Sequence, residues 1–211
     1  LDAVHWIISI FAIGYVSVTI LGSKLSDKFG RRKAFVCSLT LFLISSAFCA
    51  LAPASSFIIF LTGRLLQGIS AGTMFGVSIT IITEIFEGEN RKKWIGFMMA
   101  ASGVGFAAGP ILAGIFVDFL SWRAFFLINI PISLLSIGVY LSNFPKDKTF
   151  KKVKFDIIGV LLLTIAIASF AVIISEVKDW GFLGKKSIIL HFVWIISLVL
   201  LYIVEKLQKE P

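Results

Sequence analysis

The chain has 211 residues, of which 58% are hydrophobic and only 15% are charged, and its mean hydropathy is +0.98. A soluble domain carries about 25% charged residues, so this chain has too little polar material for a water-facing surface. The composition therefore disfavours a soluble enzyme, a disordered tail and a secreted disulfide scaffold. The formal net charge of +8 raises the question of nucleic-acid binding, which the positions of the basic residues decide.

Seven apolar runs have the length of about 17–25 residues that a helix needs to cross the core of a bilayer. In chain order the predicted spans are 4–21, 34–52, 57–85, 94–117, 124–141, 157–175 and 188–204. The polar connectors between them are 22–33, 53–56, 86–93, 118–123, 142–156 and 176–187. Because lipid offers no hydrogen bonds to the backbone, repeated runs of this length indicate helices rather than strands. The sequence predicts an all-α polytopic membrane protein.

Basic residues gather in alternate connectors. The connectors 22–33, 86–93 and 142–156, together with the tail after residue 204, hold 15 of the 20 Lys and Arg residues. The other connectors hold four, and Arg64 lies inside a span. Cytoplasmic loops carry the excess of Lys and Arg, so we expect residue 1 outside, the C-terminal tail in the cytoplasm and a location in the plasma membrane. The positive charge then reflects topology, and no nucleic-acid partner is expected.

The start of the chain shows no signal-peptide pattern, and seven spans with a cytoplasmic tail place residue 1 outside. We therefore expect a preceding helix and interpret the chain as a fragment. Cys37 and Cys49 lie on one span, about 18 Å apart at 1.5 Å per residue, which is too far for a disulfide. His5 and His191 have no companions at ligand spacing, so no metal site is predicted.

The connector 22–33 contains one acid among its cations. A basic stop-transfer loop explains the lysines and arginines, but it does not explain Asp27 between Gly22 and Gly30. We expect this carboxylate to pair with Arg31 or Arg32, or to cap a helix N-terminus. The pattern G-x-x-x-x-D-x-x-G-R-R-K resembles the signature loop between the second and third helices of the major facilitator superfamily. That resemblance implies a cytoplasmic latch between two halves of a transporter.

Arg64 lies within the span 57–85, where an arginine costs about 2.5–3.5 kcal/mol on insertion scales. One alternative is that its side chain reaches the outer headgroups. Gln67 and Gly68, at i+3 and i+4, instead place a polar, small stripe on the same face, which indicates an aqueous cavity or a partner carboxylate. The pattern R-x-x-Q-G-x-x-A-G is similar to the superfamily's fourth-helix motif, and this resemblance implies that Arg64 and Gln67 act in proton coupling.

The span 94–117 carries glycines around a proline. Gly105 and Gly109 form a face that permits close helix approach, and Pro110 removes a backbone donor. Tight packing alone would account for this pattern. The run from Gly105 to Gly114, G-x-x-x-G-P-x-x-A-G, also resembles the fifth-helix motif found mainly in antiporters of the superfamily. It departs from that motif at Ala113, where the family usually has glycine.

The end of the chain indicates a branch of the superfamily. The S-W-R-x-x-F pattern at 121–126 and the I-N-x-P pattern at 128–131 resemble one group of antiporters, and no second signature loop follows the two last spans. This organisation resembles the fourteen-spanner drug:proton antiporter family. It implies a partial N-terminal half at 1–143 that lacks its first helix, a basic cytoplasmic connector at 144–156, and two inserted helices with a tail at 157–211.

The resemblance implies an exporter that exchanges lipophilic small molecules for protons, as a monomer in the bilayer and without a cofactor other than the proton gradient. The proton-binding carboxylate is expected on the preceding helix, because Glu84 and Asp118 lie at helix ends, where we expect them to be solvated. The candidate cavity residues are Trp6, Tyr15, Phe75, Phe97 and Asn129.

Two other functions remain open. An importer that moves a metabolite with protons uses the same fold, although the Gly-Pro helix argues against it. A membrane scaffold without transport activity would not require Arg64. An enzyme is not expected, because no nucleophile–base pair or phosphate-binding loop is visible. The sequence does not specify the substrate.

Overall fold

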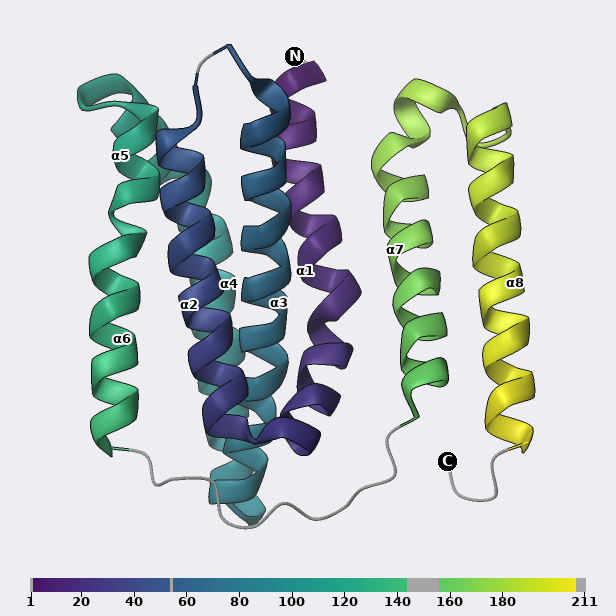
Figure 1. Cartoon of the computed structure of the whole chain (residues 1–211), viewed down its shortest axis with the longest axis horizontal. Helices are drawn as coiled ribbons and strands as arrows, with labels where there is room; N and C mark the ends of the chain where they lie inside the picture. Colours follow the sequence, from purple (N-terminus) through teal and green to yellow (C-terminus); the bar gives the residue numbers. More distant parts are fainter. Residues whose placement is uncertain (1, 54, 144–155, 208–211) are drawn as a thin grey trace.

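The computed structural model describes residues 2–53, 55–143 and 156–207. Every regular element in that part of the chain is an α-helix, and Figure 1 shows most of them side by side along one direction. The helices are α1 (Asp2–Phe29), α2 (Arg31–Leu51), α3 (Phe57–Ile85), α4 (Gly88–Phe119), α5 (Trp122–Leu127), α6 (Asn129–Asn143), α7 (Ile157–Trp180) and α8 (Lys185–Leu207). The predicted all-α class is confirmed.

Seven stretches of these helices are long and apolar enough to cross a membrane, as predicted for the part of the chain described. α5 and α6 together supply one of them, Trp122–Asn143. The predicted span 57–85 agrees with α3 at both ends, whereas most of the other helices are longer than predicted. The apolar run ends where the chain leaves the lipid, but the helix itself continues into water as long as its backbone hydrogen bonds are formed.

The predicted loop at 22–33 is the clearest correction. α1 continues to Phe29 and α2 begins at Arg31, so that Gly30 alone separates the two helices. Gly30 has a φ of 101°, a left-handed conformation that glycine adopts without steric cost. The predicted connector 86–93 is shortened in the same way, to residues 86–87. The charged residues of both segments therefore lie mostly on helical turns.

The predicted span 124–141 is divided at Ile128 into α5 and α6. The break follows from Pro131, because a proline ring clashes with the carbonyl group four residues earlier in a continuous helix. That carbonyl belongs to Leu127, the last residue of α5. Pro131 itself lies in the first turn of α6, where a missing N–H group costs little.

α1 and α3 approach each other closely along their length. Three glycines recur at every fourth position of α3, and a Cβ atom built on any of them would meet a backbone carbonyl group of α1. The pairs are Gly68 with Phe11, Gly72 with Tyr15 and Gly76 with Thr19. A hydrogen bond of 2.8 Å between the hydroxyl groups of Ser23 and Thr80 joins the same two helices. Small residues thus permit a backbone-to-backbone contact, which is typical of helices packed in membranes.

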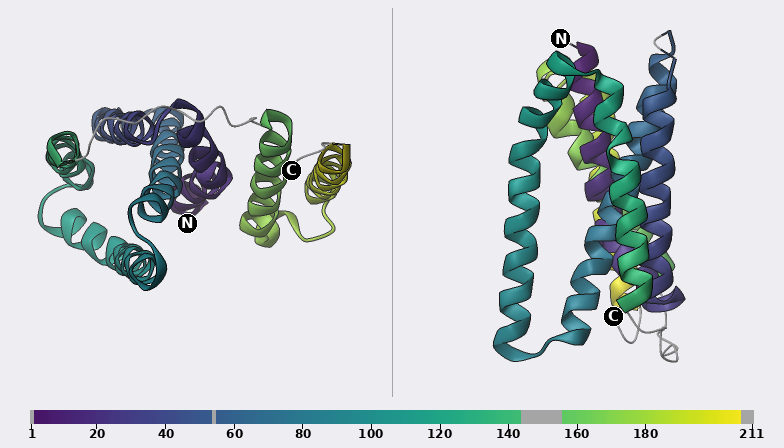
Figure 2. Two further views of the ribbon diagram at one scale, coloured as in Figure 1. Left: turned by 90° about the horizontal axis from the view of Figure 1, so that it is seen from below. Right: turned by 90° about the vertical axis from the view of Figure 1, so that its left-hand side faces the viewer.

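α4 stands apart from this contact, and Figure 2 shows it separated from the other helices along most of its length. None of its residues is buried. A Cβ atom built on Gly105, Gly109 or Gly114 would meet no other described atom within 4 Å. Among the described residues, no helix approaches the α4 glycines closely, and the close approach of two backbones is found at the α3 glycines, against α1. The role of the α4 glycines in packing stays a prediction.

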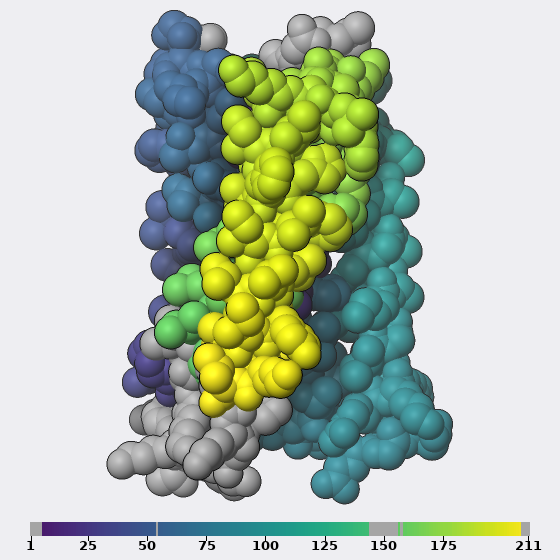
Figure 3. Space-filling model, turned by 90° about the vertical axis from the view of Figure 1, so that its right-hand side faces the viewer, coloured from purple at the N-terminus to yellow at the C-terminus, as the bar shows by residue number. Residues whose placement is uncertain are grey.

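α7 and α8 form a hairpin that contacts the other described helices through α1 alone. On the face shown in Figure 3, α8 lies outermost over α7. The side chain of Asp156 caps α7, accepting a hydrogen bond of 2.9 Å from the backbone N–H of Gly159. The rest of the predicted connector 144–156, and the last residues of the predicted tail, lie outside the described residues.

Successive connectors lie at opposite ends of the bundle in Figure 1. We call the end with Gly30 and residues 86–87 the basic end, because Arg31, Arg32 and Arg91 lie beside these connectors. The other end carries residues 52–53, 55–56, 120–121 and 181–184 between its helices, and we call it the opposite end.

The glycine contact between α1 and α3 can be tested with a matched pair of substitutions. Gly72→Ala places a methyl group against a carbonyl of α1 and must move the two helices apart, which we expect to destabilise the protein by about 1–3 kcal/mol. Gly138→Ala in α6 meets no other described atom within 4 Å and should leave stability nearly unchanged. Thermal unfolding of the purified full-length protein in detergent measures both. Equal melting temperatures for the two variants would contradict the contact.

Candidate functional site

Arg64 is held in the interior of the bundle by backbone and side-chain acceptors. Its Nε atom donates a hydrogen bond of 3.2 Å to the carbonyl oxygen of Ile7 in α1. Its Nη1 atom donates a hydrogen bond of 2.9 Å to Oε1 of Gln67, one turn further along α3. The guanidinium is therefore directed at neighbouring helical turns, and the alternative in which it reaches the headgroups is not supported.

Gln67 connects this arginine to α2. Its side chain is only 1% exposed, and its Nε2 atom donates a hydrogen bond of 2.7 Å to Oγ of Ser46. The thiol of Cys49 lies 3.8 Å from Oε1 of Gln67. The oxygen and the nitrogen of the Gln67 amide thus both form hydrogen bonds, and the amide orients the guanidinium of Arg64. The sequence analysis missed Ser46, although a serine pair at 45–46 inside an apolar run was a signal for it.

Two aromatic rings lie beside the guanidinium. The carbon at its centre is 4.5 Å from the ring centroid of Phe11 in α1 and 5.8 Å from that of Phe126 in α5. Both distances lie within the range in which a ring attracts a cation, about 6 Å. The rings replace part of the hydration that Arg64 loses in the interior.

Arg64 has no carboxylate partner among the described residues. A guanidinium carries five N–H donors, of which the two hydrogen bonds above use two. The remaining donors are suited to a carboxylate, which a guanidinium binds in a bidentate geometry.

A second charged group lies at the basic end, where α1, α2 and α3 meet. Nη2 of Arg31 is 3.3 Å from a carboxylate oxygen of Asp27, so the predicted pairing of these two residues is confirmed. Arg31 also forms an ion pair with Glu84 near the end of α3. The Glu84 side chain is 59% exposed and therefore solvated, as expected, but its ion pair with Arg31 was not predicted. Sequence reasoning missed this contact because the two residues belong to different helices.

The remaining residues of the signature motif contact other helices or form the turn at the basic end. Arg32 donates a hydrogen bond of 2.8 Å to the carbonyl oxygen of Leu141 and so connects α2 with the end of α6. Gly22 is buried against α3, and a Cβ atom on it would lie 2.6 Å from Cα of Thr73. Gly30 supplies the turn described above.

The candidate cavity residues are only partly brought together. The rings of Tyr15 and Phe75 lie 5.8 Å apart, and Phe106 of α4 joins them at 5.7 Å from Tyr15. Phe97 is 67% exposed on α4 and contacts Trp94. Trp6 in α1 and Asn129 at the start of α6 are half-buried. Phe106, which follows directly after a glycine of the α4 motif, was not among the predicted cavity residues.

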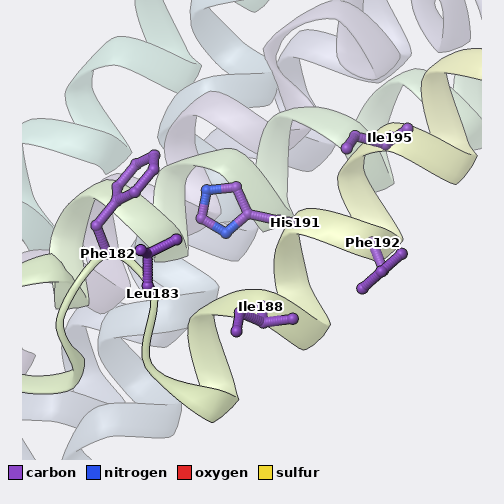
Figure 4. A pocket seen from close by; sticks show the side chains of 6 residues that line it. All are labelled: Phe182, Leu183, Ile188, His191, Phe192 and Ile195. Atoms are coloured by element: carbon purple, nitrogen blue, oxygen red, sulfur yellow. The ribbon is translucent and has the colours of Figure 1, made fainter.

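The α7–α8 hairpin contains a buried acidic residue and a pocket at its turn. Glu176 is 1% exposed, although sequence analysis placed it in a connector. A pocket of about 250 Å³ lies where α7 turns into α8, and Figure 4 shows the side chains that line it. Its lining residues are Phe182, Leu183, Ile188, His191, Phe192 and Ile195. Nδ1 of His191 lies 2.7 Å from the carbonyl oxygen of Ser187, so this imidazole is bound within its own helix.

The chain is similar in sequence to known proteins over most or all of its length. Multidrug resistance protein 3 of Bacillus subtilis (strain 168) is 30% identical over 213 residues, which cover 100% of this chain and 41% of that protein. Multidrug transporter protein MdtP of the same strain is 28% identical over 212 residues, covering 100% of this chain and 39% of that protein. Drug efflux pump JefA of Mycobacterium tuberculosis (strain ATCC 25618 / H37Rv) is 31% identical over 176 residues, covering 83% and 34%.

The chain thus spans about two fifths or less of the length of these relatives. The sequence pattern of the Major Facilitator Superfamily matches residues 1–205. This match extends along the bundle into α8, and the chain belongs to the Major Facilitator Superfamily.

Proposed function

We propose that the chain is part of a secondary transporter that exports lipophilic small molecules in exchange for protons. The observation that carries this proposal is Arg64, a cation kept inside a membrane-spanning helix by Ile7 and Gln67. An ionisable residue in such a position is costly and typically serves a functional site. The multidrug and drug-efflux names of the relatives support the class of substrate.

The proposed coupling depends on the donors that Arg64 has left over. A carboxylate from a helix outside this chain would be stabilised in its ionised form by the nearby positive charge. Proton uptake would cancel that attraction, so the carboxylate and the guanidinium would separate. The proton gradient alone supplies the energy in this scheme.

The acid–base group at the basic end is the proposed latch. The concentration of positive charge at this end supports a cytoplasmic position for it and an outside position for the opposite end. Arg31 lies between Asp27 and Glu84, so its position depends on three helices at once. A second half of the transporter would dock on this end in one state and leave it in the other. We infer residues 1–143 as part of the first half and residues 157–211 as an inserted helix pair.

Arg64→Ala tests the coupling. Loss of a hydrogen bond to a charged group costs about 1.5–3 kcal/mol, so we expect export to slow by roughly tenfold to a hundredfold. The measurement is efflux of a fluorescent lipophilic cation from energised cells, with and without an uncoupler, at equal expression. Lys185→Ala, which removes an exposed cation, serves as the control. Unimpaired export that remains sensitive to the uncoupler would refute the role of Arg64.

Asp27→Asn tests the latch. Exposed ion pairs contribute only about 0–1 kcal/mol to stability, so the variant should fold normally, turn over more slowly and bind substrate almost unchanged. Glu84→Gln should act in the same direction, because both acids share Arg31. Glu89→Gln removes an exposed pair with Lys92 near the same end and is the matched control. Turnover equal to that of the control in both variants would contradict the latch.

A further inference from the structure

The short helix α5 is attached to the opposite end of the bundle by its arginine. Nη2 of Arg123 donates a hydrogen bond of 3.2 Å to the carbonyl oxygen of Ala52, just after α2. The guanidinium also lies 4.3 Å from the ring centroid of Trp122. A cation at a helix C-terminus is stabilised by the helix dipole. An isolated helix of six residues is unstable by itself, so these contacts determine where α5 lies.

The aromatic side chains of α5 pack on α3. The ring of Phe60 is 5.4 Å from that of Trp122 and 5.4 Å from that of Phe126, both in edge-to-face geometry. Phe125 adds a third ring of α5, 5.6 Å from Phe126. Aromatic pairs in this geometry add about 0.5–1.5 kcal/mol each to the burial of their surface. The result is a continuous aromatic layer.

Arg64 and its anchors lie directly against this layer. Phe126 is 6% exposed, belongs to one buried cluster with Cys49 and Ala50, and also contacts the guanidinium of Arg64. Cys49 is fully buried beside the amide of Gln67 that holds the arginine. One side chain of α5 therefore touches both the aromatic layer and the proposed coupling residue.

We propose that α5 is a cover that keeps water at the opposite end of the bundle away from Arg64, and that Phe126 is the positioning residue through which the cover acts on the guanidinium. The inference rests on the proposed function for what Arg64 does, but not for how it is shielded. Ile128 has helical backbone angles, so α5 forms the outer end of the span that continues into α6. Arg123 and Phe60 hold the cover closed.

The cover can be tested with Cys49 as a reporter. In the full-length protein with Cys37→Ser, which removes the exposed cysteine of this chain, a membrane-impermeant methanethiosulfonate reagent is added outside intact cells. Peptide mass spectrometry then locates the label. We expect little labelling of Cys49, and labelling about tenfold faster in Arg123→Ala, because removing a charged hydrogen bond favours local opening to that extent. Phe57→Ala removes an exposed ring at the same end and should change nothing.

Rapid labelling of Cys49 without a further substitution, or equal rates in Arg123→Ala and its parent, would overturn the cover. If Arg123→Ala does not reach the membrane, Arg123→Lys replaces it, since a lysine keeps the charge but loses the planar guanidinium. The labelling does not depend on transport. If Cys49 is labelled faster in Arg123→Ala but Arg64→Ala exports normally, the cover is retained and the proposed function is rejected.

The positioning role of Phe126 has its own test. Phe126→Leu keeps an apolar side chain and removes the ring beside Arg64, whereas Phe125→Leu removes a neighbouring ring that has no contact with the guanidinium. We expect the pH profile of export to shift in Phe126→Leu and to stay at the wild-type position in Phe125→Leu. Identical profiles in the two variants would overturn the positioning role, even if both exported more slowly.

Discussion

The accommodation of one half-buried guanidinium, that of Arg64, is the constraint on which the described bundle depends. Arg64, Gly68, Gly72 and Gly76 follow one another at every fourth position of α3, and their partners on α1 show the same spacing. The partners are the carbonyl groups of Ile7, Phe11, Tyr15 and Thr19. Three positions of this row bring the two backbones together because they lack side chains. The fourth position uses the same kind of carbonyl group as a hydrogen-bond acceptor for Arg64. The glycines and the arginine are therefore parts of one contact, since the close approach of α1 places an acceptor within reach of a cation that lipid cannot solvate.

Other arginines connect helices at their ends. Arg32, Arg91 and Arg123 each donate a hydrogen bond to carbonyl groups where a helix finishes, in α6, α3 and α2 respectively. The last carbonyl groups of a helix have no partners within it, and the negative end of the helix dipole attracts a cation. These arginines therefore stabilise helix ends in addition to contributing to topology. Arg31 pairs with two acids, one on α1 and one on α3. This shared pairing is the contact on which the proposed latch depends.

The sequence predicted the number of spans, the position of α3 and, as one of three alternatives for Asp27, its pairing with Arg31, because each depends on local hydropathy or on spacing within a few residues. It did not predict where glycines pack. Both α3 and α4 carry them at intervals of four, and only the neighbouring helix decides which row is used. Ser46, Glu84 and Phe126 were missed for the same reason, since each reaches its partner across a long stretch of sequence. The helical path through residues 22–29 was missed because polarity marks the limit of the lipid and not the end of a helix.

α1 joins the separate parts of the bundle. It supplies the carbonyl of Ile7 and the ring of Phe11 to Arg64, and it carries Asp27 at the basic end. The α7–α8 hairpin contacts the other described helices only through α1. Its own ends are closed by local hydrogen bonds of Asp156 and Ser187. Among the described helices α1 alone contacts the hairpin, so the position of α1 is the described contact through which the hairpin can influence Arg64 or the acid–base group.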